Sequence, residues 1–263
     1  MRVLALDFDG VISNSAPEAF VVSLRTYAAL RPGSALAAHA ETLAGPGAPP
    51  DAVVRAAPLY APFVDAMPLG NRAEDYAVVL HALEEARPLP DQASYDAWRA
   101  QQDPTWLRLF HERFYAVRDA LSDADPEGWS ALVPPYPELI ALLHRRAGDA
   151  ALAIATAKDR RSVQTLLARY GVADLFPPER VLDKETGTSK TAHLAALQAR
   201  VDLPFRDITF VDDKVNHLDL TAPLGVRCAL AAWGYNGPRE RQLARSHGYL
   251  VCQLSDVEEK LYG

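Results

Sequence analysis

Residues 1–15 read Met1-Arg2-Val3-Leu4-Ala5-Leu6-Asp7-Phe8-Asp9-Gly10-Val11-Ile12-Ser13-Asn14-Ser15, so a short apolar run ends in two acidic residues and a glycine. An apolar run of this length, bounded by polar residues, is typical of a buried strand in a parallel sheet. Side chains alternate along a strand, so we expect Asp7 and Asp9 on one side and Phe8 on the other. The sequence therefore predicts a first strand over residues 2–6 with two carboxylates at its end.

Four later segments resemble this first run and are predicted to be further strands. They cover residues 150–155, 207–211, 227–232 and 249–254. Apolar residues at helical spacing lie between them, over residues 136–146, 161–170 and 191–200. Strands that alternate with helices imply right-handed crossovers. We therefore predict the α/β class, with a doubly wound, mostly parallel, Rossmann-like sheet.

The middle of the chain has a different pattern. Fourteen of the 20 prolines fall within residues 32–137, and no strand-like run occurs in that stretch. Helical periodicity covers residues 18–30, 72–86 and 104–121, and the aromatic stripe of the last segment is interpreted as core. We predict a helical domain, residues 16–134, inserted after the first strand of a core domain that comprises residues 1–15 and 135–263.

The composition excludes several classes of protein. The chain has 263 residues, of which 49% are hydrophobic, and a net charge of −7, which argues against nucleic acid as a partner. No apolar run approaches the roughly 20 residues of a membrane span, and the N-terminus turns acidic too early for a signal peptide. Two cysteines, Cys228 and Cys252, do not make a disulfide scaffold. We expect a cytoplasmic protein, a monomer or homodimer, with no nucleic-acid or membrane partner.

Residues suited to catalysis follow three of the predicted strands. Asp7 and Asp9 follow the first, Thr156 follows the second, and Asp212 and Asp213 follow the third. In open α/β sheets, ligands bind outside the carboxyl ends of the strands, where these side chains would meet. Neighbouring carboxylates repel one another unless a cation lies between them, and Mg²⁺ prefers oxygen ligands. The pattern therefore indicates a magnesium site.

Four segments in this order resemble the motifs of the haloacid dehalogenase-like (HAD) superfamily. They are residues 7–15, 154–156, 189–190 and 210–213. The inserted helical region lies where that superfamily has a helical C1 cap domain, and residues 232–236 are similar to its phosphoglycolate-phosphatase-like branch. The resemblance implies a Mg²⁺-dependent phosphatase, a phosphoric monoester hydrolase that cleaves a small phosphorylated metabolite through an aspartyl-phosphate intermediate.

The resemblance also implies a role for each catalytic residue. Asp7 would be the nucleophile that takes the phosphoryl group, and Asp9 would be the general acid and then the general base. Thr156 would hydrogen-bond a phosphoryl oxygen, and Lys190 would neutralise the charge on the phosphate and on Asp7. Asp7, Asp212 and the main-chain carbonyl of Asp9 would hold Mg²⁺.

The phosphate-binding set has one open choice. Besides Thr156 and Lys190, it would include Ala157 and Lys158, which follow Thr156 directly. Lys184 is the alternative to Lys190. We favour Lys190 because it opens a predicted helix, as the corresponding lysine of the superfamily does.

The last motif departs from the superfamily pattern at one position. A second aspartate often lies four residues after the first, where this chain has Asn216. Either Asp213 or Asn216 would therefore complete the outer shell of the metal site. We expect the adjacent His217 to be a surface histidine and not a ligand, because oxygen donors suit this site.

Three other functions compete with the phosphatase. Dehalogenases of haloalkanoates lack an acid at the position of Asp9, which argues against that reaction. A phosphomutase would keep every motif residue. A non-catalytic binding protein of the same fold usually loses the nucleophile or the acid, and both are present here.

Overall fold

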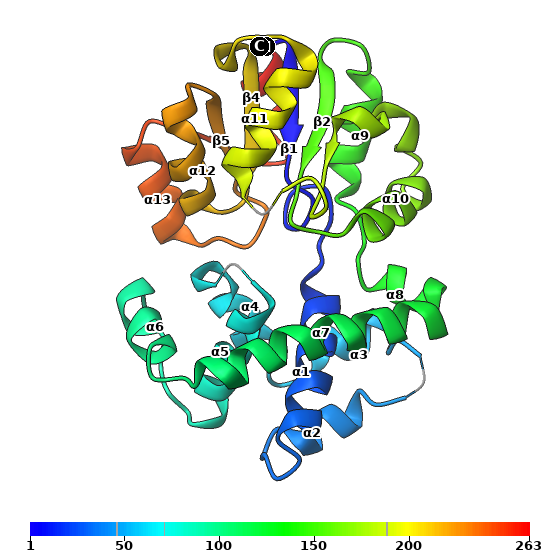
Figure 1. The fold of residues 1–263 in the computed structure, drawn as a ribbon, viewed down its shortest axis with the longest axis vertical. Coiled ribbons are helices and arrows are strands. Elements are labelled where there is room, and N and C mark those ends of the chain that lie inside the picture. The colour runs from blue at the N-terminus through cyan, green and yellow to red at the C-terminus, as the bar shows by residue number, and fades with distance from the viewer. Residues whose placement is uncertain (46, 71, 188) are drawn as a thin grey trace. The chain divides into compact units, whose positions relative to one another are not determined.

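Six strands form one parallel sheet in the computed structural model, which describes residues 1–45, 47–70, 72–187 and 189–263 (Figure 1). Their order across the sheet is β3-β2-β1-β4-β5-β6. The strands are β1 (Val3–Leu6), β2 (Ala151–Ala155), β3 (Val181–Leu182), β4 (Ile208–Asp212), β5 (Arg227–Ala231) and β6 (Leu250–Cys252). Each neighbouring pair runs parallel, which confirms the predicted α/β class.

Strand β3 is the one that the sequence analysis did not predict. Its two residues, Val181 and Leu182, pair with Ile154 and Ala155 of β2. A run of two apolar residues is too short to stand out by periodicity, which needs at least four. This edge strand is therefore recognised by its pairing with β2 and not by its own sequence pattern.

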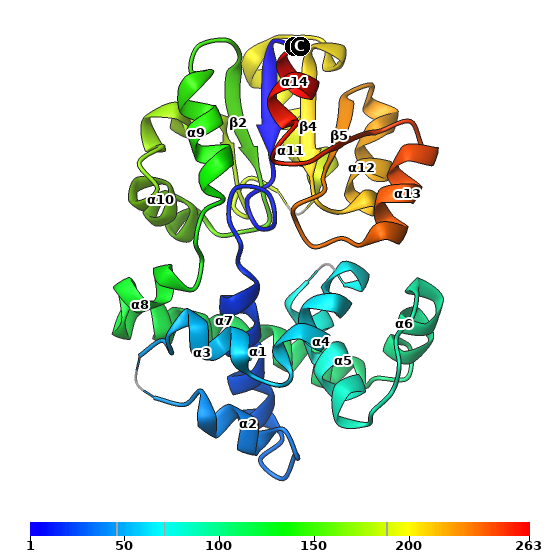
Figure 2. The ribbon, with the colours of Figure 1, turned by 180° about the vertical axis from the view of Figure 1, so that it is seen from behind.

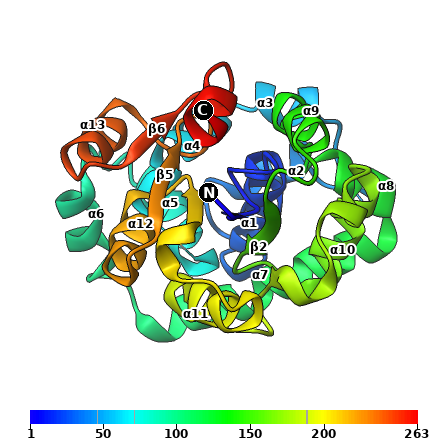
Figure 3. The same cartoon turned by 90° about the horizontal axis from the view of Figure 1, so that it is seen from above.

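Helices cover both faces of the sheet. They are α9 (Pro137–Arg145), α10 (Arg160–Arg169), α11 (Lys190–Val201), α12 (Val215–Thr221), α13 (Pro238–Ser246) and α14 (Val257–Tyr262). Figure 3 shows α11 and α12 on one face and α9 and α14 on the other. Leu194 and Leu197 of α11 and Leu218 of α12 pack in one buried cluster with Val3 and Ala5 of β1. Alternation along β1 directs its other residues to the opposite face, so both faces are apolar.

The chain divides into two units, Met1–Asn14 with Pro135–Gly263, and Ser15–Pro134. The predicted first boundary, after residue 15, is one residue late. Ser15 belongs to the helical unit because its carbonyl oxygen accepts the N–H of Ala19 in the first turn of α1 (Ala16–Leu30).

The second unit consists of helices, several of which pack along α1 (Figure 2). They are α1, α2 (Ala37–Thr42), α3 (Asp51–Ala56), α4 (Tyr60–Ala66), α5 (Ala73–Glu84), α6 (Gln92–Arg99), α7 (Pro104–Ala124) and α8 (Pro126–Ala131). Local signals start the longest of them, α7, because the Asp103 carboxylate accepts the N–H of Thr105 and Pro104 opens the helix. The aromatic stripe of α7 is core, as predicted, since Phe110 and Phe114 are buried.

A buried ion pair joins α1 to α7 in the helical unit. Arg118 donates through Nε and Nη2 to the two carboxylate oxygens of Glu18, and the Nη2–Oε2 distance is 3.0 Å. The Glu18 side chain is fully buried. The indole N–H of Trp129 points at the same carboxylate, 3.4 Å from Oε1. Loss of either partner would leave an uncompensated charge buried in the helical unit.

Replacement of Arg118 by Met is expected to destabilise the helical unit by about 3 kcal/mol, because Glu18 would stay buried without its counter-charge. Urea unfolding monitored by tryptophan fluorescence measures the change. The double variant Glu18→Gln/Arg118→Met is the control and should be more stable than Arg118→Met alone. Equal stability of the single variant and the wild-type protein would contradict the prediction.

No helix within the described residues has the length and apolarity needed to span a membrane.

Candidate active site

The carboxyl ends of three adjacent strands bring the predicted residues to one edge of the sheet. Leu6 of β1 pairs with Ile154 of β2 and with Val211 of β4. Asp7, Thr156 and Asp212 therefore stand at the ends of neighbouring strands, although up to 205 positions separate them in sequence. The strand register alone produces this grouping, as expected for a doubly wound sheet.

Lys190 links the three strand ends. Its Nζ lies 2.7 Å from Oδ1 of Asp7 and 3.2 Å from Oδ2 of Asp212, and it donates to the carbonyl oxygen of Ala155 at 2.8 Å. The position is fixed locally because Ser189 caps α11, accepting the N–H of Ala192. Lys190 is thus the first residue of that helix, and its side chain is buried.

The two candidate lysines, Lys184 and Lys190, differ in burial and in their contacts. Lys184 is exposed in the loop after β3, whereas Lys190 contacts the carboxylates. Burial by itself would lower the pKa of Lys190, but the charges of Asp7 and Asp212 outweigh it and raise the pKa. Lys190 therefore stays a cation at neutral pH and balances part of the negative charge around it.

The two oxygens of Asp7 have different surroundings. Oδ1 accepts the N–H of Phe8 at 2.7 Å and the Nζ of Lys190. Within the described residues, Oδ2 makes no hydrogen bond. Burial raises the pKa of Asp7 to about 6; Lys190 opposes this shift and Asp212 adds to it. Asp7 is therefore a carboxylate at neutral pH with one oxygen fixed and the other available.

The raised pKa of Asp7 predicts a pH dependence of stability in the presence of a chelator. The folded pKa, about 6, lies above the ordinary 3.8, so between these values the native state holds a proton that the unfolded state has lost. Relative to Asp7→Asn, the wild-type protein should gain stability as the pH falls from about 7 to about 5. This contribution is fully present below 3.8 and is lost as the pH rises through 6. Urea denaturation of both proteins across this range tests it, and a parallel pH dependence of the two would contradict it.

Asp9 is paired with Lys158. The Nζ of Lys158 lies 3.0 Å from Oδ1 and 3.4 Å from Oδ2 of Asp9. The Lys158 side chain is fully buried, while that of Asp9 is 33% exposed. Lys158, predicted to bind phosphate, thus contacts the proposed acid directly. It holds the Asp9 carboxylate at the end of β1 and partly open to solvent.

The segment after β2 forms a tight turn. Thr156 is buried, its N–H donates to the carbonyl of Leu182, and its Oγ1 accepts the N–H of Lys158 at 3.1 Å. Ala157 between them is exposed. The turn also brings Lys158 close enough to reach Asp9 in the loop after β1.

An ion pair that the sequence analysis missed supports this turn. Asp183, which follows β3 and is fully buried, accepts from Nε of Arg160 at 2.7 Å and from Nη2 at 3.1 Å. The backbone N–H of Lys184 also donates to the carbonyl of Lys158. The loop after β3 is thereby tied to the loop that carries Thr156 and Lys158.

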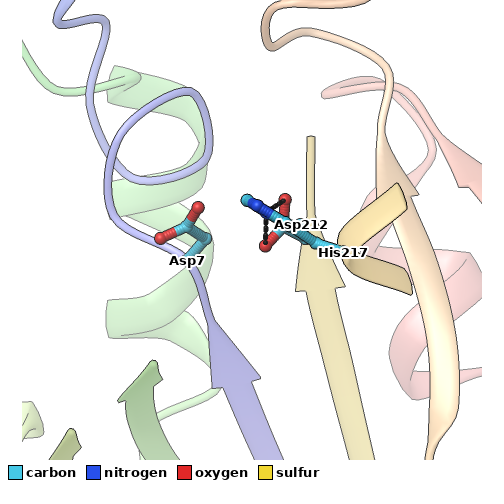
Figure 4. A group of neighbouring side chains, drawn as sticks. All are labelled: Asp7, Asp212 and His217. Atoms are coloured by element: carbon cyan, nitrogen blue, oxygen red, sulfur yellow. Dashed lines mark hydrogen bonds and ion pairs between the residues drawn. The ribbon is translucent and has the colours of Figure 1, made fainter. Parts of the chain in front are cut away.

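His217 is not the surface residue that we expected. Its Nδ1 lies 3.1 Å from each oxygen of Asp212, and its side chain is only 20% exposed (Figure 4). Burial would raise the pKa of Asp212, but His217, Lys190 and the N–H of Lys214 hold it well below its ordinary value. Asp212 is therefore ionised.

Asp213 and Asn216, the two candidates for the outer shell of the metal site, have different surroundings in the structure. Asp213 is buried, and its Oδ2 accepts the N–H of Tyr235 at 2.7 Å. Asn216 is exposed on α12. Gly10 lies against Asp213, with φ +81°, and a Cβ atom there would approach Oδ2 to 2.3 Å. Asp213 thus supports the loop after β1, which carries Asp9.

The donor set fits a divalent cation. Asp7, Asp212 and Asp213 are buried carboxylates, and Lys190 carries the buried positive charge among them. Burial, and then the charge of Asp212, raise the pKa of Asp213 well above its ordinary value. One ligand atom from each of Asp7, Asp212 and His217 lies within 4.8 Å of the others. A hard cation held by carboxylate oxygens would relieve the repulsion.

Comparisons with known proteins identify the fold. No protein family model matches the chain, and no curated protein matches it. Among solved structures, a haloacid dehalogenase-like family hydrolase from Streptococcus pneumoniae aligns over 99% of this chain and 98% of its own, with 12% identity and a TM-score of 0.63.

Proteins with phosphatase names are among the similar structures. A predicted phosphoglycolate phosphatase from Haemophilus somnus is 17% identical, with a TM-score of 0.58, and a predicted phosphatase from Clostridium acetobutylicum is 12% identical, with a TM-score of 0.57. Each alignment covers 99% of this chain and 97% of the other. The chain therefore has the haloacid dehalogenase-like fold, as the motifs predicted.

Proposed function

We propose that the protein is a Mg²⁺-dependent phosphatase that hydrolyses a small phosphorylated metabolite through an aspartyl-phosphate intermediate on Asp7. The observation that carries this proposal is the asymmetry of Asp7. Lys190 and the N–H of Phe8 hold Oδ1, while Oδ2 makes no hydrogen bond within the described residues. A carboxylate oriented through one oxygen presents the other as a nucleophile.

In the first step, Oδ2 of Asp7 attacks phosphorus, and the bond from phosphorus to the leaving oxygen breaks. This step requires Asp9 in its protonated form; its proton passes to that oxygen, so the product leaves as an alcohol. Lys158, which contacts both oxygens of Asp9, holds the acid at the edge of the sheet where Asp7 lies. Lys190 and the hydroxyl of Thr156 would bind the phosphoryl oxygens.

In the second step, water attacks phosphorus and the bond to Oδ2 of Asp7 breaks. Asp9, now a carboxylate, takes the proton of the water, which restores both residues and releases inorganic phosphate. The carboxylates of Asp7 and Asp212 and the main-chain carbonyl of Asp9 would hold Mg²⁺. The ion would neutralise charge on the phosphoryl group, which is the main requirement of phosphoryl transfer.

Hydrolysis of p-nitrophenyl phosphate with Mg²⁺ and with excess EDTA tests the proposal. We expect turnover with Mg²⁺ and none with EDTA. A panel of sugar phosphates and phosphoglycolate then identifies the substrate class, with released phosphate as the readout. Absence of phosphate release from every compound, acetyl phosphate included, would refute the hydrolase.

The same panel distinguishes the alternatives. Conversion of a sugar phosphate to its isomer without phosphate release would show a phosphomutase. Binding of a phosphorylated compound without either reaction would show a binding protein. The presence of both Asp7 and Asp9 at one sheet edge supports catalysis over binding.

Three further expectations belong to this proposal. We propose that the helical unit serves as a cap domain of the C1 type and that the enzyme acts in the cytoplasm. We also propose a monomer or homodimer that needs no nucleic acid or membrane. Size-exclusion chromatography with light scattering tests the oligomeric state.

A further inference from the structure

His217 brings a nitrogen donor to a site otherwise built from oxygen. It lies in the first turn of α12, which follows β4 after the short link 213–214. Figure 4 shows its ring beside the Asp212 carboxylate, with Asp7 across from them at the end of β1. Among the described residues, this is the one group of histidine, cysteine and acidic side chains arranged closely enough to hold a metal ion.

The spacing of His217 Nδ1 and the Asp212 oxygens matches that between neighbouring ligands of a single ion. Neighbouring ligands of an octahedral cation are about 3 Å apart, and opposite ligands about 4 Å, for bonds of about 2.1 Å. Nδ1 of His217 lies 3.1 Å from each oxygen of Asp212, and an Asp7 oxygen completes a group within 4.8 Å. Small side-chain movements would bring all three atoms onto one cation.

The nitrogen changes which cation the site prefers. Mg²⁺ favours oxygen ligands, whereas imidazole nitrogen suits first-row transition ions. We propose that His217 is a nitrogen ligand of the divalent-cation site formed by Asp7 and Asp212, so that the site binds Mn²⁺ and Co²⁺ in preference to Mg²⁺. This inference rests on the cation site of the proposed function and specifies its metal. The ring ligates as the tautomer with its proton on Nε2.

Other histidines of the core unit have different partners. Nε2 of His193 lies 3.1 Å from the carbonyl oxygen of Asp183 and 3.0 Å from that of Gly187. His247 contacts Asp219 at 2.7 Å, near the surface. His247 thus provides a matched control, because it is also a histidine beside an aspartate but lies outside the metal-binding group.

The decisive experiment is electron spin echo envelope modulation of the Mn²⁺-loaded full-length protein. Nitrogen bound to Mn²⁺ modulates the echo at ¹⁴N frequencies. We expect this modulation in the wild-type protein and in His247→Gln, and its loss in His217→Gln. Glutamine keeps an amide that can donate to Asp212 but offers no ligating nitrogen. A wild-type spectrum without ¹⁴N modulation, or its persistence in His217→Gln, overturns the proposal.

Metal affinities provide a second readout that does not depend on turnover. Isothermal titration calorimetry with Mg²⁺ and Co²⁺ gives the ratio of the two dissociation constants. Loss of the nitrogen ligand is expected to reduce the preference for Co²⁺ by roughly tenfold or more in His217→Gln, and to leave it unchanged in His247→Gln. An unchanged ratio in His217→Gln overturns the proposal. If this variant does not fold, His217→Asn replaces it, and the wild-type spectrum remains decisive.

The outcomes separate this inference from the proposed function. Phosphate release with Mg²⁺ but no ¹⁴N modulation would retain the phosphatase and reject the nitrogen ligand. Modulation without phosphate release under any of the three metals would retain the mixed-ligand site and reject the phosphatase.

Discussion

Replacement of Asp7 by Asn is expected to lower the turnover of p-nitrophenyl phosphate by about 10⁴-fold or more, because it removes the atom that forms the covalent intermediate. The amide is a far weaker nucleophile than a carboxylate. The fold should persist, since Lys190 keeps its contacts with Asp212 and with the carbonyl oxygen of Ala155. Initial rates with Mg²⁺, measured alongside urea unfolding, separate loss of chemistry from loss of structure.

The stability of Asp7→Asn carries independent information. Burial raises the pKa of Asp7, so the ionised side chain costs folding free energy at neutral pH without a bound cation. We therefore expect the variant to be at least as stable as the wild-type protein in EDTA. Addition of Mg²⁺ should stabilise the wild-type protein more than the variant, which lacks one carboxylate ligand. Retained turnover in a correctly folded variant would rule out Asp7 as the nucleophile.

Asp9→Asn is the matched control, because it removes a carboxylate two residues further along the chain. p-Nitrophenolate leaves readily and needs little protonation, whereas an alkoxide needs the acid. Asp9→Asn should therefore lose more activity on an alkyl phosphate than on p-nitrophenyl phosphate, and Asp7→Asn should lose both. Equal losses on the two substrates in Asp9→Asn would argue against its role as the acid.

The residues at the carboxyl ends of the strands could be predicted because the local sequence pattern marks where each strand ends. An apolar run followed by Asp7, Thr156 or Asp212 locates each residue, and the parallel sheet brings the ends together. Lys190 was also predictable, since Ser189 marks the start of its helix.

The partners of these residues were less predictable. Whether Lys158 binds phosphate or Asp9 depends on the turn after β2, which the sequence does not determine. The short helices α2, α3 and α4 lie in a part of the sequence that is rich in alanine and proline and has no clear period.

His217 lies in α12, a helix that the sequence analysis did not predict. Val215 and Leu218 are buried, and they mark the inner face of α12, which leaves Asn216 exposed. His217 lies between these faces, so its ring can turn towards Asp212 or towards solvent. The apolar positions around it would have excluded Asn216 from the site. They would not have shown the contact of His217 with Asp212, which depends on how α12 leaves β4.

Replacement of Lys190 by Met is expected to reduce both stability and turnover. The Nζ of Lys190 lies between the buried carboxylates of Asp7 and Asp212, and methionine would leave these two charges to repel each other. Removal of one partner from a buried ionic group typically costs about 3 kcal/mol, and we expect a loss of this size in EDTA. Turnover should fall by about 10³-fold, because a cation that stabilises the phosphoryl oxygens is lost.

The metal dependence of Lys190→Met distinguishes charge balance from simple packing. A divalent cation bound by Asp7 and Asp212 would supply the missing positive charge, so Mg²⁺ should restore part of the stability of the variant. It should not restore turnover, because Lys190 also contacts the nucleophile directly. Lys184→Met is the matched control, because it removes the other candidate lysine, which is exposed. Its stability and its turnover should both stay close to the wild-type values. If Lys184→Met lost turnover and Lys190→Met kept it, the catalytic lysine would be Lys184, and the ammonium group beside Asp7 would have only a structural role.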